Sequence, residues 1–212
     1  EDGSVITVHC PNPGAMMGLN TPGVRCWISD SGNPKRKLRH TLEVMEAIGP
    51  GGKVMVGINT NLPNRLAQEA LDAGLILELT GYDSLRREVK YGENSRIDIL
   101  LESPDRRPCY VEIKNVHLVR STGKHEFPDC KTERGAKHLR EMAQMVKGGA
   151  RAVMLYVIQR GDGETFSLAR DLDPGYAQAF DDARADGVEA LAIRCQISEH
   201  EIIATTPIPV VV

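Results

Sequence analysis

The chain has 212 residues, of which 41% are hydrophobic, and it carries a formal net charge of −3. This size is enough for a folded core, and the negative total excludes a uniformly basic protein that coats nucleic acid. No apolar run approaches the roughly 18 residues of a membrane span. The five cysteines are widely spaced and form no CxxC pair. We therefore expect a cytoplasmic protein with reduced thiols and no membrane partner.

The first part of the chain predicts a small β-barrel. Short apolar stretches at 4–10, 24–29, 38–47 and 53–58 alternate with turns rich in glycine and proline, which is typical of short strands in a barrel. The chain begins at what resembles a hairpin turn, Glu1 to Gly3, so a first strand is expected to be missing before it. This domain is expected to span residues 1–58.

From Asn59 the pattern changes to a mixed α/β domain, expected to span residues 59–212. Asn61 and Pro63 predict the start of a helix that ends at Gly74. The elements predicted after it are strands at 75–80 and 85–90, a hairpin at 95–116, a helix at 131–147, a strand at 152–159, a helix at 174–186, and strands at 188–194 and 200–205. Helices interspersed with strands in this way favour a mixed sheet covered by helices.

The central hairpin carries the first candidate site. Symmetrical pairing about its loop sets Asp98 across from Glu112 or Lys114, and residues two apart on a strand share a face. Two adjacent carboxylates supply the hard oxygen ligands that Mg²⁺ or Mn²⁺ prefers, and a neighbouring lysine can orient a water or help to deprotonate it. The alternative is an ordinary structural ion pair across the strands.

The predicted helix after Asn59 adds a further acidic candidate. Leu62, Leu66, Glu69 and Ala73 are spaced by four, three and four residues, so Glu69 is expected on or beside the core-facing stripe. Glu69 is therefore a candidate metal ligand, directly or through water. The alternative is a residue at the edge of the buried face.

The helix at 131–147 is basic. Gly135, Leu139, Met142 and Val146 are expected to form its buried stripe. This leaves two polar flanks, formed by Lys131, Arg134 and His138 and by Lys137, Arg140, Gln144 and Lys147. Such a row suits a phosphodiester backbone, although a solvated helix face has the same pattern. His138 could be a general acid, a phosphate ligand or merely a surface residue.

Three features of the N-terminal part have both a structural and a functional interpretation. The loop CPNPGAMMG is either a tight barrel turn or a phosphate contact through Asn12 and the backbone of Gly14. The basic run KRKLRH, which contains Arg36, is either a solvated run or a track for a nucleic-acid strand. Trp27, the only tryptophan, is either part of the core or a platform for a stacked base.

Longer strings carry a family resemblance. CPNPGAMMG (10–18), GINTNLPNRLAQEAL (57–71), SRIDILL (95–101), VEIKNVHLV (111–119) and FPDCKTERGAKHLREM (127–142) together resemble the sugar fermentation stimulation protein A (SfsA) family over essentially the whole chain. Asp98 followed by Glu112-x-Lys114 is similar to the PD-(D/E)XK nuclease constellation.

The resemblance implies an N-terminal OB-like β-barrel and a restriction-endonuclease-like, mixed-sheet α/β domain. It also implies DNA binding, a loose connection with the regulation of sugar metabolism, and a metal site at Glu69, Asp98 and Glu112, with Lys114 in the position of the nuclease lysine. Thr132, Arg134, Gly135 and His138 fall in a second signature segment, to which we assign contacts with substrate or phosphate.

Three functions are compatible with these features. The first is a DNA-binding protein, without sequence preference, that keeps a divalent-metal phosphodiesterase site. The second is a DNA-binding regulator on a nuclease-like scaffold whose acidic site no longer catalyses, because a shared fold can host either role. The third, a sugar-binding sensor, is disfavoured by an aromatic content of only 4%.

Overall fold

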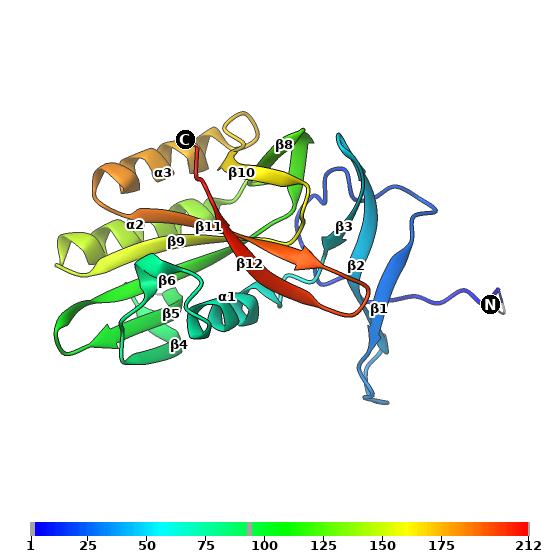
Figure 1. The fold of residues 1–212 in the computed structure, drawn as a ribbon, viewed down its shortest axis with the longest axis horizontal. Coiled ribbons are helices and arrows are strands. Elements are labelled where there is room, and N and C mark those ends of the chain that lie inside the picture. Colours follow the sequence, from blue (N-terminus) through cyan, green and yellow to red (C-terminus); the bar gives the residue numbers. More distant parts are fainter. Residues whose placement is uncertain (1–2, 93–94, 212) are drawn as a thin grey trace.

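The computed structural model describes residues 3–92 and 95–211, and Figure 1 shows how their helices and strands are arranged. The described strands form three sheets, two of three strands and one of six. The predicted turn at Glu1 to Gly3 falls largely on Glu1 and Asp2, which lie outside the described residues.

The N-terminal domain is OB-like and is built on a three-stranded antiparallel sheet. Its strands are β1 (Cys26–Asp30), β2 (His40–Gly49) and β3 (Gly52–Gly57). Leu19, Leu42, Met45, Val56 and Ile58 fill its core. Among the described residues the strands do not close a complete barrel. In the described part of the chain, the strand predicted at 4–10 is reduced to one bridge between His9 and Thr41.

The second domain is built on a mixed six-stranded sheet in the order β12-β11-β9-β6-β5-β4. Its strands are β4 (Ser84–Tyr91), β5 (Ser95–Ser103), β6 (Arg106–Val116), β9 (Arg151–Ile158), β11 (Glu189–Ile197) and β12 (Ile202–Ile208). The three central strands β6, β9 and β11 run parallel, and the outer pairs are antiparallel. The predicted fold class is confirmed.

Helices cover both faces of this sheet (Figure 1). On one face, α2 (Glu133–Lys147) and α3 (Pro174–Ala185) pack through Leu139, Met142 and Phe180. On the other face, α1 (Pro63–Asp72) packs through Leu66 and Ala70. Because both faces are covered, β9 is apolar along nearly its whole length, as expected for a central parallel strand.

Two features of the second domain differ from the sequence prediction. The strand predicted at 75–80 is a short 3-10 helix, η1 (Leu77–Leu79), in which Leu77 is exposed and Leu79 buried. A small third sheet was not predicted, and it contains β7 (Leu118–Ser121), β8 (Gly123–Phe127) and β10 (Gly163–Leu168). Its strands are short and its β8–β10 pair joins distant segments, so local periodicity gives little signal.

In the described part of the chain, no helix is both long enough and apolar enough to cross a membrane.

Candidate functional site

The candidate site lies where β5 and β6 separate. The predicted hairpin register is confirmed, because Ile99 pairs with Val111 and Leu101 with Cys109. The backbone pairing of the two strands ends at Ile99, and at the preceding residue the side chain of Asp98 accepts a hydrogen bond from β6. Its Oδ2 accepts a hydrogen bond from the backbone N–H of Ile113 at 2.7 Å. The carboxylate of Asp98 is thus held between the two strands.

Helix α1 reaches Asp98 from the other direction. The side-chain amide of Asn64 donates to Asp98 Oδ1 at 2.8 Å. Both oxygens of the Asp98 carboxylate therefore have a donor, and each keeps a second lone pair for another partner. Sequence reasoning missed Asn64, and its only local signal is a polar residue beside the buried positions Pro63 and Leu66.

Glu112 is the second carboxylate, and two side chains share one of its oxygens. Lys114 Nζ donates to Glu112 Oε1 at 2.7 Å, and His138 Nδ1 of α2 forms a hydrogen bond with the same oxygen. Arg134 Nε contacts the other ring nitrogen of His138 at 3.5 Å. Glu112 is 3% exposed. The structure thus brings Asp98, Glu112, Lys114 and His138 together, with Arg134 at the edge.

The two carboxylates have opposite electrostatic surroundings. Burial, followed by the negative charge of Glu112, raises the pKa of Asp98 above its ordinary value, and the hydrogen bonds from Ile113 and Asn64 only partly oppose this. Burial also tends to raise the pKa of Glu112, but His138 and Lys114 outweigh it, so the pKa of Glu112 is lowered. Glu112 is therefore the carboxylate that stays ionised most readily.

The second oxygen of Glu112 is free in a buried position. Glu112 Oε2 has no hydrogen-bond partner among the described residues, and the same holds for the Tyr91 hydroxyl and for Glu141 Oε2. Burial, followed by the charges of Glu112, Glu141 and Asp98, strongly raises the pKa of Tyr91. Tyr91 therefore stays protonated and can donate a hydrogen bond toward this acidic region.

Glu69 does not face this cluster, so its predicted position is wrong. The buried residues of α1 are Pro63, Leu66, Ala67 and Ala70. These positions define a buried face that is rotated away from the predicted stripe through Leu62, Leu66, Glu69 and Ala73, and Glu69 lies outside it. The side chain of Glu69 is 54% exposed and pairs with Arg65 at 3.4 Å. Five positions separate Asn64 from Glu69, which places them on different sides of the helix.

The residues of α2 that were predicted to contact substrate or phosphate are partly structural and partly exposed. The hydroxyl of Thr132 caps α2 by accepting from Gly135 N at 3.1 Å, and Gly135 itself is buried. Lys137 is exposed and pairs with Glu141 of the same helix at 3.6 Å. Lys131 is exposed beside the start of α2. His138 is buried, so its interpretation as a surface residue is wrong.

The N-terminal candidates Asn12 and Arg36 make local contacts. Asn12 Oδ1 accepts from Gly14 N at 3.0 Å, and its amide donates to Ile58 O at 3.3 Å, so Asn12 stabilises its own turn. Arg36 donates to Thr41 Oγ1 at 3.2 Å. The structure joins neither of them to the acidic cluster through these contacts.

A polar contact between the domains was not predicted. Asp129 Oδ2 accepts from the backbone N–H of Met16 at 2.9 Å and lies 3.2 Å from His117 Nε2. A Cβ added at Gly14 would lie 2.7 Å from the same oxygen, so this close approach requires glycine. Asp129 therefore fastens the CPNPGAMMG loop to the second domain.

The donor set at Asp98 and Glu112 suits a hard divalent cation only in part. The carboxylate oxygens are the right ligand type, and the buried, free Glu112 Oε2 is a ready donor. Across the described ranges, however, no group of three or more His, Cys, Asp or Glu side chains is arranged to hold a metal. Mg²⁺ keeps several waters, so two protein carboxylates can suffice.

Two family models match separate stretches of this chain. A family model described as "Sugar fermentation stimulation protein RE domain" matches residues 61–201, and one described as "SfsA N-terminal OB domain" matches residues 1–58. The chain belongs to the SfsA family. A family member from Maricaulis maris, named "Sugar fermentation stimulation protein homolog", is 55% identical over 209 residues, which cover 99% of this chain and 87% of the relative.

Two further SfsA-family proteins extend the comparison. A homolog of the same name from Sinorhizobium medicae is 54% identical, with 99% of this chain and 86% of the relative covered. A solved structure described as "The structure of Pyrococcus Furiosus SfsA in complex with Ca2+" has a TM-score of 0.84 and 25% identity. The match covers 97% of this chain and 85% of that one.

Proposed function

We propose that this SfsA-family protein binds DNA without sequence preference and hydrolyses phosphodiester bonds with the help of Mg²⁺ or Mn²⁺. The observation that carries the proposal is that a buried carboxylate, Glu112, and a partly buried one, Asp98, lie with a lysine between two separating strands. Asp98 and Glu112 would hold the cation, and Lys114 lies 2.7 Å from Glu112. The Pyrococcus furiosus SfsA was solved in complex with Ca²⁺, which supports a divalent cation in this family.

The chain's own groups have distinct roles in this proposal. Lys114 would hold a non-bridging phosphate oxygen or the attacking water, and Glu112 fixes the position of its ammonium group. His138 orients Glu112 and is itself contacted by Arg134. When bound, the cation would polarise a phosphoryl oxygen and make a coordinated water more acidic.

The exposed basic residues beside the site support binding of a phosphodiester backbone. Arg134, Lys137 and Arg140 are exposed on α2, the helix that also provides His138. Contacts with phosphates neutralise charge and position a strand without distinguishing bases. We therefore expect affinity to fall steeply as salt concentration rises.

A second candidate function has an observation in its favour. Glu112 is already paired with Lys114 and hydrogen-bonded to His138, and the described residues provide no third acidic ligand beside it. This arrangement also suits a DNA-binding regulator that no longer catalyses cleavage.

The test is cleavage of supercoiled, linear and single-stranded DNA by the full chain with Mg²⁺ or Mn²⁺. We expect Asp98→Asn to abolish cleavage and Lys114→Ala to lower it by about two orders of magnitude or more, as for the loss of a group that assists proton transfer. Glu69→Gln is the matched control, because it removes an exposed carboxylate and should leave cleavage unchanged. Salt-sensitive DNA binding without cleavage under either metal would overturn the catalytic proposal and favour the regulator.

A further inference from the structure

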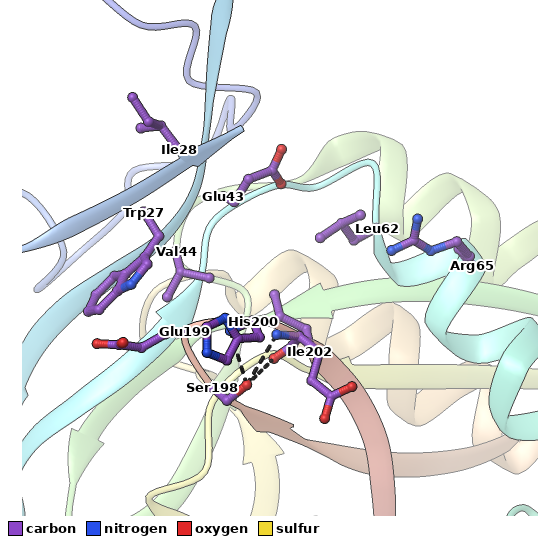
Figure 2. A pocket seen from close by; sticks show the side chains of 11 residues that line it. Trp27, Ile28, Glu43, Val44, Leu62, Arg65, Ser198, Glu199, His200 and Ile202 are labelled. Carbon is purple, nitrogen blue, oxygen red and sulfur yellow. Dashed lines mark hydrogen bonds between the residues drawn. The ribbon is translucent and has the colours of Figure 1, made fainter. Parts of the chain in front are cut away.

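A groove of about 340 Å³ lies between the two domains. Figure 2 shows its side chains, which come from β1 and β2, from the start of α1 and from the turn between β11 and β12. Trp27, Glu43, Leu62, Arg65, Glu199 and His200 are among the residues that line it. The groove is separate from the carboxylate cluster and plays no part in the proposed chemistry.

Trp27 is the feature of the groove that indicates a ligand. Its side chain is only partly buried and borders the groove (Figure 2). The guanidinium of Arg25 lies 5.0 Å from the centre of the indole ring, and Arg25 also pairs with Glu199 across the domain junction at 3.2 Å. The ring is therefore held in a defined position and still borders open space. A fixed, accessible aromatic ring is a suitable platform for a stacked base.

The charges around the groove select which part of a nucleic acid can enter. Both oxygens of Glu43 accept hydrogen bonds, from Ser29 at 2.6 Å and from Asn59 at 2.8 Å. Carboxylates along a wall repel phosphates but accept hydrogen bonds from the exocyclic amino groups of cytosine, adenine and guanine. A base can therefore enter the groove while its phosphate stays at the mouth, beside the exposed guanidinium of Arg65.

The groove and the carboxylate cluster lie on either side of the first turn of α1. Leu62 and Arg65 line the groove, whereas Asn64 binds Asp98. A helix is about 10 Å across with its side chains. Stacked DNA advances about 3.4 Å per nucleotide along one strand, so a few nucleotides span this distance. One strand can thus reach both places.

From these relationships we propose that the groove receives one unpaired base of a single-stranded segment, stacked on Trp27, a few nucleotides from the phosphate at Asp98 and Glu112. This inference rests on the proposed function and adds a strand preference to it. A base inside a duplex cannot reach such a platform without leaving its stack. Single strands, or duplexes with a single-stranded end, are therefore the preferred ligands.

The test measures binding of fluorescein-labelled oligonucleotides to the full chain in EDTA, so that no cleavage occurs. Trp27→Ala should weaken single-strand binding about 5- to 150-fold, the range for loss of one stacked base, and should leave duplex binding nearly unchanged. Trp27→Phe keeps a ring and should stay close to the unaltered chain. Ile48→Ala, at an exposed apolar residue of β2, is the control. Equal single-strand affinity for the Trp27→Ala variant and the unaltered chain would overturn the inference.

A measurement on the unaltered chain decides the question if Trp27→Ala does not fold. Trp27 is the only tryptophan, so its fluorescence reports directly on the groove. We expect quenching by a cytosine oligonucleotide, weaker quenching by a thymine oligonucleotide, and least by an oligonucleotide of abasic sites. Binding without any change in the fluorescence would place the strand elsewhere. These binding measurements do not require cleavage. They can therefore refute the base-binding groove without refuting the proposed function, which is tested separately by the cleavage activity of Asp98→Asn.

Discussion

Asn64 donates a hydrogen bond from its side-chain amide to Asp98 Oδ1 at 2.8 Å, which joins the first turn of α1 to the central sheet. The contact fixes a carboxylate that is also held by the backbone of Ile113. Asn64→Ala should lower the free energy of unfolding by about 1–3 kcal/mol, because a partly buried acceptor loses its partner. Urea unfolding at neutral pH measures this. Gln68→Ala, one turn later, should change it by less than about 0.5 kcal/mol, and similar losses in both variants would contradict the assignment.

The binding of a divalent cation should depend on pH through Asp98. Burial and the charge of Glu112 raise the pKa of Asp98, and a carboxylate must lose its proton to bind a cation. Affinity should therefore increase as pH rises through a window above the ordinary range of aspartate, with release of a proton. Calorimetric titration with Mn²⁺ in buffers of different ionisation enthalpy measures both quantities. A pH-independent affinity would argue against cation binding at Asp98.

The raised pKa of Asp98 should also make the stability of the fold depend on pH. Because the pKa of Asp98 is raised in the folded state, the folded protein binds this proton more tightly than the unfolded chain does. The stabilisation is present at low pH and is lost as pH rises from the unfolded pKa through the folded pKa. Asp98→Asn should remove this part of the pH dependence of unfolding. An unchanged pH profile in the variant would show that Asp98 is not the group responsible.

The contact between His117 and Asp129 should stabilise the junction between the domains. Burial tends to raise the pKa of Asp129, but the hydrogen bonds from His117 and the backbone of Met16 outweigh it, so the pKa of Asp129 is lowered. The resulting stabilisation is present above the ordinary pKa of aspartate and is lost as pH falls through the lowered value. At neutral pH, His117→Ala should cost about 1–3 kcal/mol. Urea unfolding tests this, with His200→Ala on an exposed turn as the control.

His125 should make the protein sensitive to moderately acidic pH. Burial lowers the pKa of His125 to about 4, despite its hydrogen bond with Gly163 O. Its neutral form stabilises the folded state above the ordinary pKa of 6.5, and this contribution is lost as pH falls from 6.5 toward 4. The loss is on the order of 3 kcal/mol, since one pKa unit corresponds to about 1.4 kcal/mol. In His125→Gln, unfolding free energy should fall less across this range. An equal fall in the variant and in the unaltered chain would show that His125 is not the group responsible.

The hairpin part of the site could be predicted because it depends on local rules. Alternation of side chains sets Glu112 beside Lys114, and the short loop sets the register that brings Asp98 to them. The position of Glu69 could not be obtained in this way. It depends on which side of α1 packs on the sheet, and successive residues of a helix point about 100° apart, so a small error in the choice of buried positions moves Glu69 off the buried face.

Other parts of the site depend on contacts between remote segments. His138 reaches Glu112 only because α2 packs on the sheet, and a row of polar residues on a helix does not reveal which of them is buried. The pairing of β8 with β10 and the contact of Asp129 with Met16 join segments that are far apart in the chain. Periodicity carries no information about such pairings.

Asp129 connects the N-terminal domain to the carboxylate cluster through a short stretch of chain and helix α2. Asp129 is fastened to the backbone of Met16, and the chain then runs directly to Thr132, the cap of α2. Helix α2 carries His138 to Glu112. The four residues 129–132 therefore both hold the N-terminal loop and set the start of the helix that supplies His138 to the acidic residues.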